Sequence, residues 1–121
     1  MLDVSEKVGT LLSSICEHFN YEVEYYFIHA PQDATLPCIV YYELSNSDHD
    51  YYTGMEVSNI IYEFIIFSND PELIFDLRKV LDATLYENGF LKKSVSQVSY
   101  IEPVYMQSYH YSIRVHEFYN K

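Results

Sequence analysis

The sequence predicts an α+β fold: a single domain, residues 1–121, in which two helices pack on a largely antiparallel sheet of about five strands. Two segments place apolar residues at three- and four-residue steps, as amphipathic helices do, and several other runs are rich in β-branched and aromatic residues. These segments follow one another as helix, strands, helix, strands, without an internal repeat or a low-complexity linker. A doubly wound parallel sheet would need more crossover connections than 121 residues allow.

The first helix is expected over residues 3–19. Asp3 and Glu6 have the spacing of a capping box, with aspartate in the place of serine or threonine. The apolar face of this helix is then formed by Val4, Val8, Leu11, Leu12, Ile15, Cys16 and Phe19. In residues 21–27, tyrosine, valine and phenylalanine alternate with Glu22, Glu24 and Tyr26, which predicts a half-buried strand or an extended segment.

The middle of the chain predicts two strands and the connection between them. Residues 38–44 are rich in β-branched and aromatic side chains and predict an inner strand. Residues 57–67 form the longest β-type run, and their apolar content on both faces predicts a central strand or a second face covered by another subunit. Residues 45–54 begin with turn formers and end in glycine, so we expect a connection of about ten residues there.

A second helix and a final pair of strands complete the prediction. The motif at 69–72 supplies a cap residue, a proline at the first helical position and a carboxylate in the first turn. Leu77, Val80 and Leu81 lie on the apolar face of the helix, and an Asn-Gly pair at 88–89 supplies a left-handed stop. Residues 95–101, closed by Pro103, and residues 109–116 then predict two antiparallel strands.

The charge of the chain limits its partners. The formal net charge is −11, and no lysine or arginine lies between Lys7 and Arg78, an interval that holds twelve of the 18 carboxylates. Such a surface repels phosphate backbones and anionic membranes. We therefore expect a soluble protein with no membrane partner and no sequence-specific contact with nucleic acid.

The cysteines and the N-terminal residues indicate a compartment. Cys16 and Cys38 lie within apolar patterns and not in a paired framework, which favours a reducing, cytoplasmic environment. The first residues are acidic where a signal peptide needs positive charge, and no apolar run approaches the roughly 18 residues of a membrane span.

The sequence predicts no catalytic, metal or cofactor site. His110, His116 and Glu117 are the only close group of metal-ligand residues, and on a strand the two histidines would lie about 20 Å apart. Glu22 and Glu24 would share one face of a strand, which leaves a hydrolase with paired carboxylates as the least favoured alternative. A solvated strand edge is the preferred interpretation of this pair.

Fourteen tyrosines indicate a contact surface. Adjacent tyrosines on a strand point to opposite faces, so one ring of each pair should lie outside the core. Outward rings are typical of protein interfaces. The candidate interface residues are Tyr26, Tyr42, Tyr51, Tyr52 and Tyr62. A sugar-stacking surface, or cross-strand pairing that only stabilises the sheet, remains open.

Several segments in order resemble a known family. They are the proline-led run at 36–44, Gly54, the long run at 59–67, the helix start at 69–72 and the Asn-Gly-Phe sequence at 88–90. This pattern resembles the tail completion proteins of long-tailed bacteriophages, which are small tail terminator or head-tail joining proteins. The similarity covers roughly residues 3–118 in order and spacing.

The resemblance implies an α+β subunit without enzyme activity that assembles into a ring, commonly a hexamer, through which DNA passes. The implied partners are further copies of the chain, the tail tube and the head connector, and the implied locations are the bacterial cytoplasm during assembly and the virion. The family has no fixed catalytic or ligand residues to transfer. Connector adaptors and other minor tail components remain open as relatives.

A channel that lets DNA slide should carry carboxylates on its wall, because attraction to phosphates would stall the passage. The candidate channel-lining residues are Asp48, Asp50, Glu56, Glu22 and Glu24. The alternative function is a small cytoplasmic binding module that uses a tyrosine-rich face for a protein or small-molecule ligand.

Overall fold

The computed structural model describes residues 3–50 and 55–118, and the side chains within these ranges except those of 48–50, 55, 56 and 116–118. The described chain contains two helices and six strands. In order they are α1 (Ser5–Glu17), β1 (Glu24–Phe27), β2 (Cys38–Asp50), β3 (Met55–Ser68), α2 (Pro71–Glu87), β4 (Leu91–Val95), β5 (Ser99–Ile101) and β6 (Val104–Phe118).

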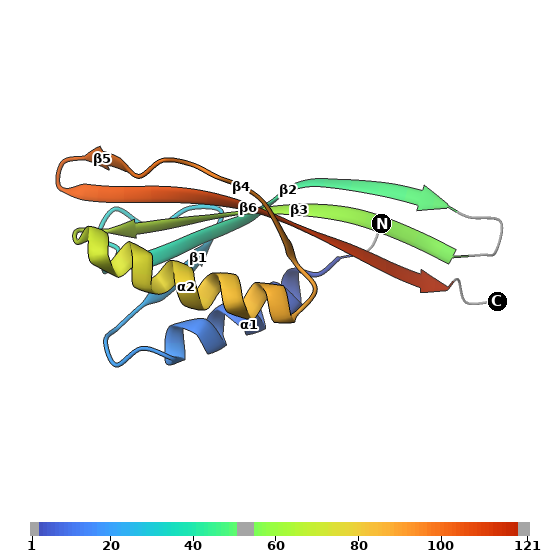
Figure 1. Ribbon diagram of the computed structural model, residues 1–121, viewed down its shortest axis with the longest axis horizontal. Coiled ribbons are helices and arrows are strands. Elements are labelled where there is room, and N and C mark those ends of the chain that lie inside the picture. The colour runs from blue at the N-terminus through green and yellow to red at the C-terminus, as the bar shows by residue number, and fades with distance from the viewer. Residues whose placement is uncertain (1–2, 51–54, 119–121) are drawn as a thin grey trace.

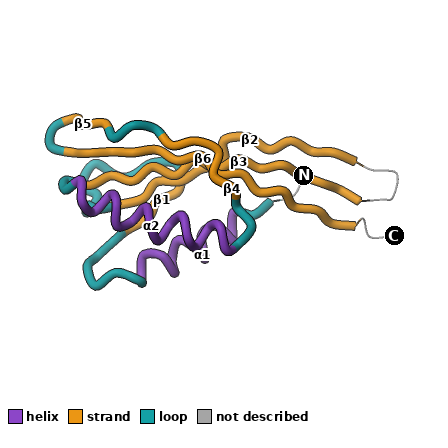
Figure 2. The backbone as a smooth tube through the Cα atoms, viewed as in Figure 1, coloured by secondary structure: helices purple, strands orange, loops and turns teal. Residues whose placement is uncertain are grey.

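The strands form one mostly antiparallel sheet, which confirms the predicted α+β class. Its order is β1-β2-β3-β6-β4, and β5 pairs with β6 on the same side as β4. Among the described strands, β1 and β2 are the one pair joined in parallel. Both helices lie against one side of the sheet (Figures 1 and 2), which we call the helix face, and the opposite side is the outer face.

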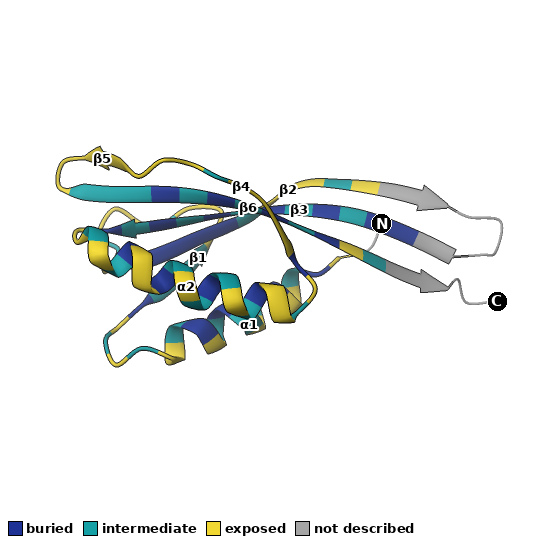
Figure 3. Cartoon of the chain, in the orientation of Figure 1, coloured by how far each residue is buried: buried dark blue, intermediate teal, exposed yellow. Residues whose placement is uncertain are grey.

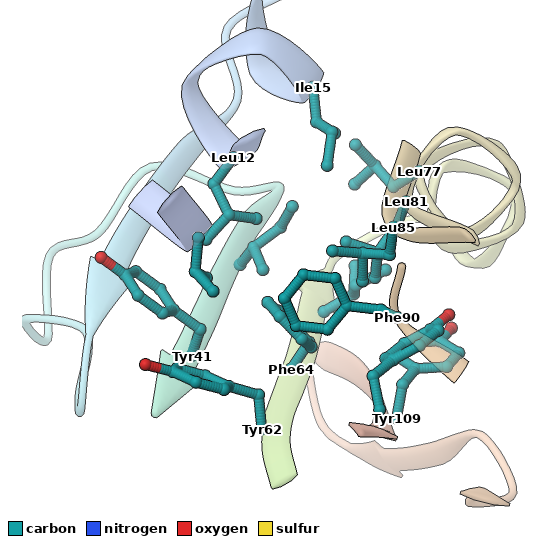
Figure 4. Packing of buried hydrophobic residues seen from close by; sticks show 14 of the residues in the cluster. Leu12, Ile15, Tyr41, Tyr62, Phe64, Leu77, Leu81, Leu85, Phe90 and Tyr109 are labelled. Carbon is teal, nitrogen blue, oxygen red and sulfur yellow. The ribbon is translucent and has the colours of Figure 1, made fainter. Parts of the chain in front are cut away.

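The hydrophobic core lies between the helices and the helix face (Figure 4). The central strand β3 contributes Tyr62 and Phe64, which alternate with half-buried residues on the outer face. The helices contribute Val8, Leu12 and Ile15 from α1 and Ile74, Leu77, Leu81 and Leu85 from α2, all fully or almost fully buried. Each such side chain contributes about 1.5–3 kcal/mol of transfer free energy, so these two helices fix the sheet in place.

The predicted limits of α2 are confirmed. Asp70 is the N-cap, and its Oδ1 accepts a hydrogen bond from the Glu72 N–H at 3.0 Å, while Pro71 begins the helix. Gly89 ends it with a φ of 90°, a conformation that glycine adopts without steric cost. Leu77 and Leu81 are buried as expected, and Val80 is half-buried.

The first helix is shorter than predicted and begins differently. It spans Ser5–Glu17 with Val4 at the N-cap position, where no side chain caps it. Asp3 lies one residue earlier, and its Oδ1 accepts from the Ser5 N–H at 2.9 Å. The expected capping box is therefore wrong, because the aspartate precedes the cap position that the box requires.

The connection predicted at 45–54 is wrong in most of its length. Strand β2 continues to Asp50 and pairs with β3 throughout, with one irregularity between Glu43 and Ser45 that leaves Leu44 as an extra residue. Residues 45–50 are turn formers by local preference. They form a strand because β3 offers a continuous ladder of backbone hydrogen bonds, and such pairing overrides local preference.

The last strands also differ from the prediction. The run at 95–101 is divided between β4, which begins earlier at Leu91, and β5, and both pair with the long strand β6. The strand predicted at 21–27 begins only at Glu24, and its partner β2 runs parallel to it. Pairing partners of this kind are set by the whole sheet and are not encoded in a local pattern.

Candidate assembly surfaces

Three strands extend past the helices and form an arm (Figure 1). We define the arm as residues 45–50 of β2, 55–61 of β3 and 112–118 of β6, which remain paired along its length. Its register places Asp50 opposite Glu56, and Glu56 opposite Glu117, so three acidic positions lie in one row across the sheet.

The candidate channel residues fall into two separate groups. Asp48, Asp50 and Glu56 lie on the strands of the arm and not in a loop. Glu24 lies on β1 opposite Cys38, at the other end of β2. Ten residues of strand separate Cys38 from Asp48, which is about 33 Å at 3.3 Å per residue. The structure therefore does not join Glu22 and Glu24 to the acidic positions of the arm.

Glu22 and Glu24 form a close pair beside β1. The pKa of Glu24 is raised, first because its side chain is hydrogen-bonded to Glu22, and then by partial burial and by the negative charge of Glu22. The pair lies on the open edge of the sheet, as the sequence indicated.

The candidate interface tyrosines do not share one surface. Tyr62 is 1% exposed and belongs to the core, so its prediction as an interface residue is wrong: even-numbered positions of β3 point to the helices. Tyr26 and Tyr42 are half-buried and lie on the outer face, opposite Val40 and Glu63. The tyrosines at 51 and 52 lie outside the described residues.

A polar row crosses the outer face next to Tyr42. His110 Nε2 lies 3.2 Å from Glu63 Oε1, and His110 Nδ1 lies 3.1 Å from Ser94 Oγ, so β3, β6 and β4 each contribute one group. A carboxylate, an imidazole and a hydroxyl in series can hold and orient a proton. Sequence reasoning missed this row because its members are 16 or more residues apart and are joined only by strand order. The position of His110 between two buried tyrosines was the one sequence pattern that could have placed its side chain on the outer face.

The row lies on a strand surface, where nucleophilic catalysis would also need donors for an oxyanion and a cleft for substrate. The His110 side chain is 33% exposed and that of Glu63 is 14% exposed. The outer face also carries an apolar pocket, but Glu63, Ser94 and His110 do not line it. The geometry therefore supports a stabilising polar contact across the outer face.

The apolar pocket lies between the connection at 28–36 and the outer face. Its volume is about 370 Å³, which is within the range of small-ligand sites, and Val40, Ile65 and Phe67 form part of its wall. Ile28, at its rim, has a φ of 74°, which is uncommon for a β-branched residue. Burial raises the pKa of the Cys38 thiol in the wall to about 11, so this thiol stays protonated and unreactive.

In the part of the chain that the structure describes, no group of three or more histidine, cysteine and acidic side chains could hold a metal ion. No helix within these residues has the length and apolar character needed to cross a membrane. A scan against protein-family models found no match for the sequence, and a comparison with curated proteins also found none.

Proposed function

We propose that the chain is a structural protein of a phage or prophage, a tail completion or tail terminator subunit that assembles into a ring at the head-tail junction. The observation that carries the proposal is the arm, which extends past the helices and bears a row of acidic positions. An α+β subunit is also what the family resemblance implies.

The arm suits the wall of a channel for DNA. A net charge of −11 makes the chain repel phosphate backbones, and the acidic row concentrates this repulsion at one end of the molecule. Within a closed ring, each subunit would place its arm at an equivalent position, so the acidic rows would repeat around the axis. DNA would then pass without being held.

The proposal includes partners and location. The subunit binds further copies of itself, commonly six in a ring, and contacts the tail tube and the head connector. It acts in the bacterial cytoplasm during assembly and afterwards in the virion, without enzyme activity and without a cofactor.

The test replaces Asp48, Asp50 and Glu56 together with lysine. We expect the variant to fold and assemble, but to bind DNA in a salt-dependent manner and to give particles that eject DNA poorly. The measurements are subunit assembly by light scattering and DNA ejection from reconstituted tails.

The matched control carries Asp33→Lys, Glu87→Lys and Glu102→Lys, three exposed sites outside the arm that give the same change in net charge. This control should assemble and eject like the parent. If the arm variant also ejects like the parent and acquires no affinity for DNA, the arm does not line the channel.

The pocket on the outer face favours a second candidate, a small-ligand binding module. It is apolar and no tyrosine lines it, although Tyr26 lies opposite its wall residue Val40 on the outer face. Thermal-shift screening with apolar metabolites tests this function, using Val40→Trp to fill the pocket. A strict monomer whose stabilising ligands lose their effect in Val40→Trp would support binding and contradict assembly.

A further inference from the structure

The sheet has two open edges. In the described ranges, β1 at one end of the sheet and β4 at the other each pair with only one strand. An unpaired strand edge presents free backbone N–H and C=O groups, and it is a template for pairing with another chain. The chemistry of the two edges differs, which decides what each can bind.

The first edge is negative, and we call it the acidic edge. It consists of β1 with Glu22 and Glu24, and the neighbouring surface of α1 forms a groove of about 550 Å³ lined in part by Glu6, Glu17 and Tyr25. Lys7, the lysine of α1, is directed elsewhere, since its Nζ donates to the Asn88 carbonyl oxygen at 3.1 Å. The acidic edge therefore presents carboxylates beside a strand that pairs only with β2 within the described residues.

The second edge is positive, and we call it the basic edge. It consists of β4, with Lys92 and Lys93, and the stripe of α2 that contains Lys79 and Asp82. Asp82 joins the helix to the strand: its Oδ2 accepts from Lys92 Nζ at 2.7 Å, and the same oxygen lies 4.0 Å from Arg78 Nε. Four of the seven lysine and arginine residues of the chain lie on this edge.

Two of these four cations are available for a partner. Lys79 and Lys93 are exposed and form no ion pair within the described residues. Apolar side chains accompany them, because Leu91 is 61% exposed and Tyr86, on the same α2 stripe as Lys79, is 73% exposed. Strand β5 continues this exposed side of the molecule (yellow in Figure 3).

We propose that the acidic edge of one copy pairs with the basic edge of the next copy, so that the sheet continues from subunit to subunit. The two surfaces are different patches of one chain, so the contact is head-to-tail, the type that closes into a ring. Strand directions within the sheet make β1 antiparallel to β4, and a continued sheet would pair these strands antiparallel. This assignment of the interface rests on the proposed ring assembly.

A second copy fits these edges better than an unrelated partner. Copies with a net charge of −11 repel one another except where one presents its cations, and four of the seven lysine and arginine residues lie on the basic edge. The edge strands have comparable lengths, four residues in β1 and five in β4. The exposed Phe27 and Ile28 at the end of β1 supply apolar surface on the acidic side, as Leu91 and Tyr86 do on the basic side.

The test uses two charge-reversal variants. The first carries Glu22→Lys and Glu24→Lys, and the second carries Lys79→Glu and Lys93→Glu; Lys92 is kept because it binds Asp82. We expect each variant alone to associate about tenfold or more weakly than the parent in sedimentation velocity, because like charges then face each other. An equimolar mixture should assemble again in alternation, and so should a chain with all four changes.

Controls separate an interface effect from a folding effect. Glu43→Lys with Glu72→Lys changes the charge at two exposed sites that belong to neither edge, and this control should assemble like the parent. Circular dichroism should show the parental fold in every variant. If the parent forms rings and either edge variant does so equally well, or if mixing fails to restore assembly, the edge assignment is wrong while the ring survives. If the parent is a strict monomer, the proposed function fails together with the interface.

Discussion

Leu81→Ala tests the packing of α2 against the sheet. Leu81 is fully buried between Leu77 and Leu85 on the face of α2 that meets the core (Figure 4). The Asp70 cap and the turn at Gly89 fix the two ends of the helix, so it cannot move closer to fill the space that the mutation leaves. We therefore expect a loss of about 3–4 kcal/mol of unfolding free energy, within the range of about 2–5 kcal/mol for such changes.

The assay is a urea titration at a concentration where the chain is monomeric. With a slope of about 2 kcal/mol per molar, the expected loss lowers the midpoint by about 1.5–2 M. Lys79→Ala is the control on the same helix, and because its side chain is exposed we expect a change within about 0.5 kcal/mol. A loss below about 0.5 kcal/mol for Leu81→Ala would refute the assigned helix face.

Three further predictions follow from caps and raised pKa values. Asp70→Ala should cost about 1 kcal/mol in the same titration, because it removes the N-cap acceptor, and no loss would contradict that role. Burial raises the pKa of Tyr62 to about 12 and also raises the pKa of Tyr109. The folded state favours the neutral phenols, so their contribution to the free energy of unfolding is complete below about pH 10 and is lost as the pH rises towards 12. Absorbance titration should show these phenols ionising only when the protein unfolds. Normal titration near pH 10 in the folded protein would contradict their burial. Burial also raises the pKa of Cys16 and Cys38 to about 11. Because the thiolate is the form that reacts, iodoacetamide should alkylate these cysteines at pH 8 about 100-fold more slowly than a thiol of pKa 9. Equal alkylation rates would contradict the burial of the two thiols.

The parts of the fold that local chemistry determines were predictable from the sequence. The start of α2 at Pro71, its stop at Gly89 and the buried positions Leu77 and Leu81 all follow from capping and helical spacing. The central place of β3 followed from its apolar character on both faces. These features depend on neighbours in the sequence, and tertiary contacts reinforce them.

The parts that depend on distant partners were not predictable. The polar residues 45–50 became a strand only because β3 pairs with them, and the segment after Gly89 became an edge strand only because β6 lies beside it. The same dependence on strand pairing explains why the candidate surfaces were predicted only in part. Tyr62 was assigned to the wrong face, and the contact of His110 with Glu63 and Ser94 requires the strand order to be known.

The mass of the parent protein in solution tests the central claim most directly. Light scattering from micromolar to millimolar concentration should show a transition from the 14.3 kDa subunit to a closed assembly whose mass reaches a plateau, six times the subunit mass for a hexamer. A closed ring requires such a plateau. A chain that remains at the subunit mass throughout this range, or one that grows without limit, would contradict the ring.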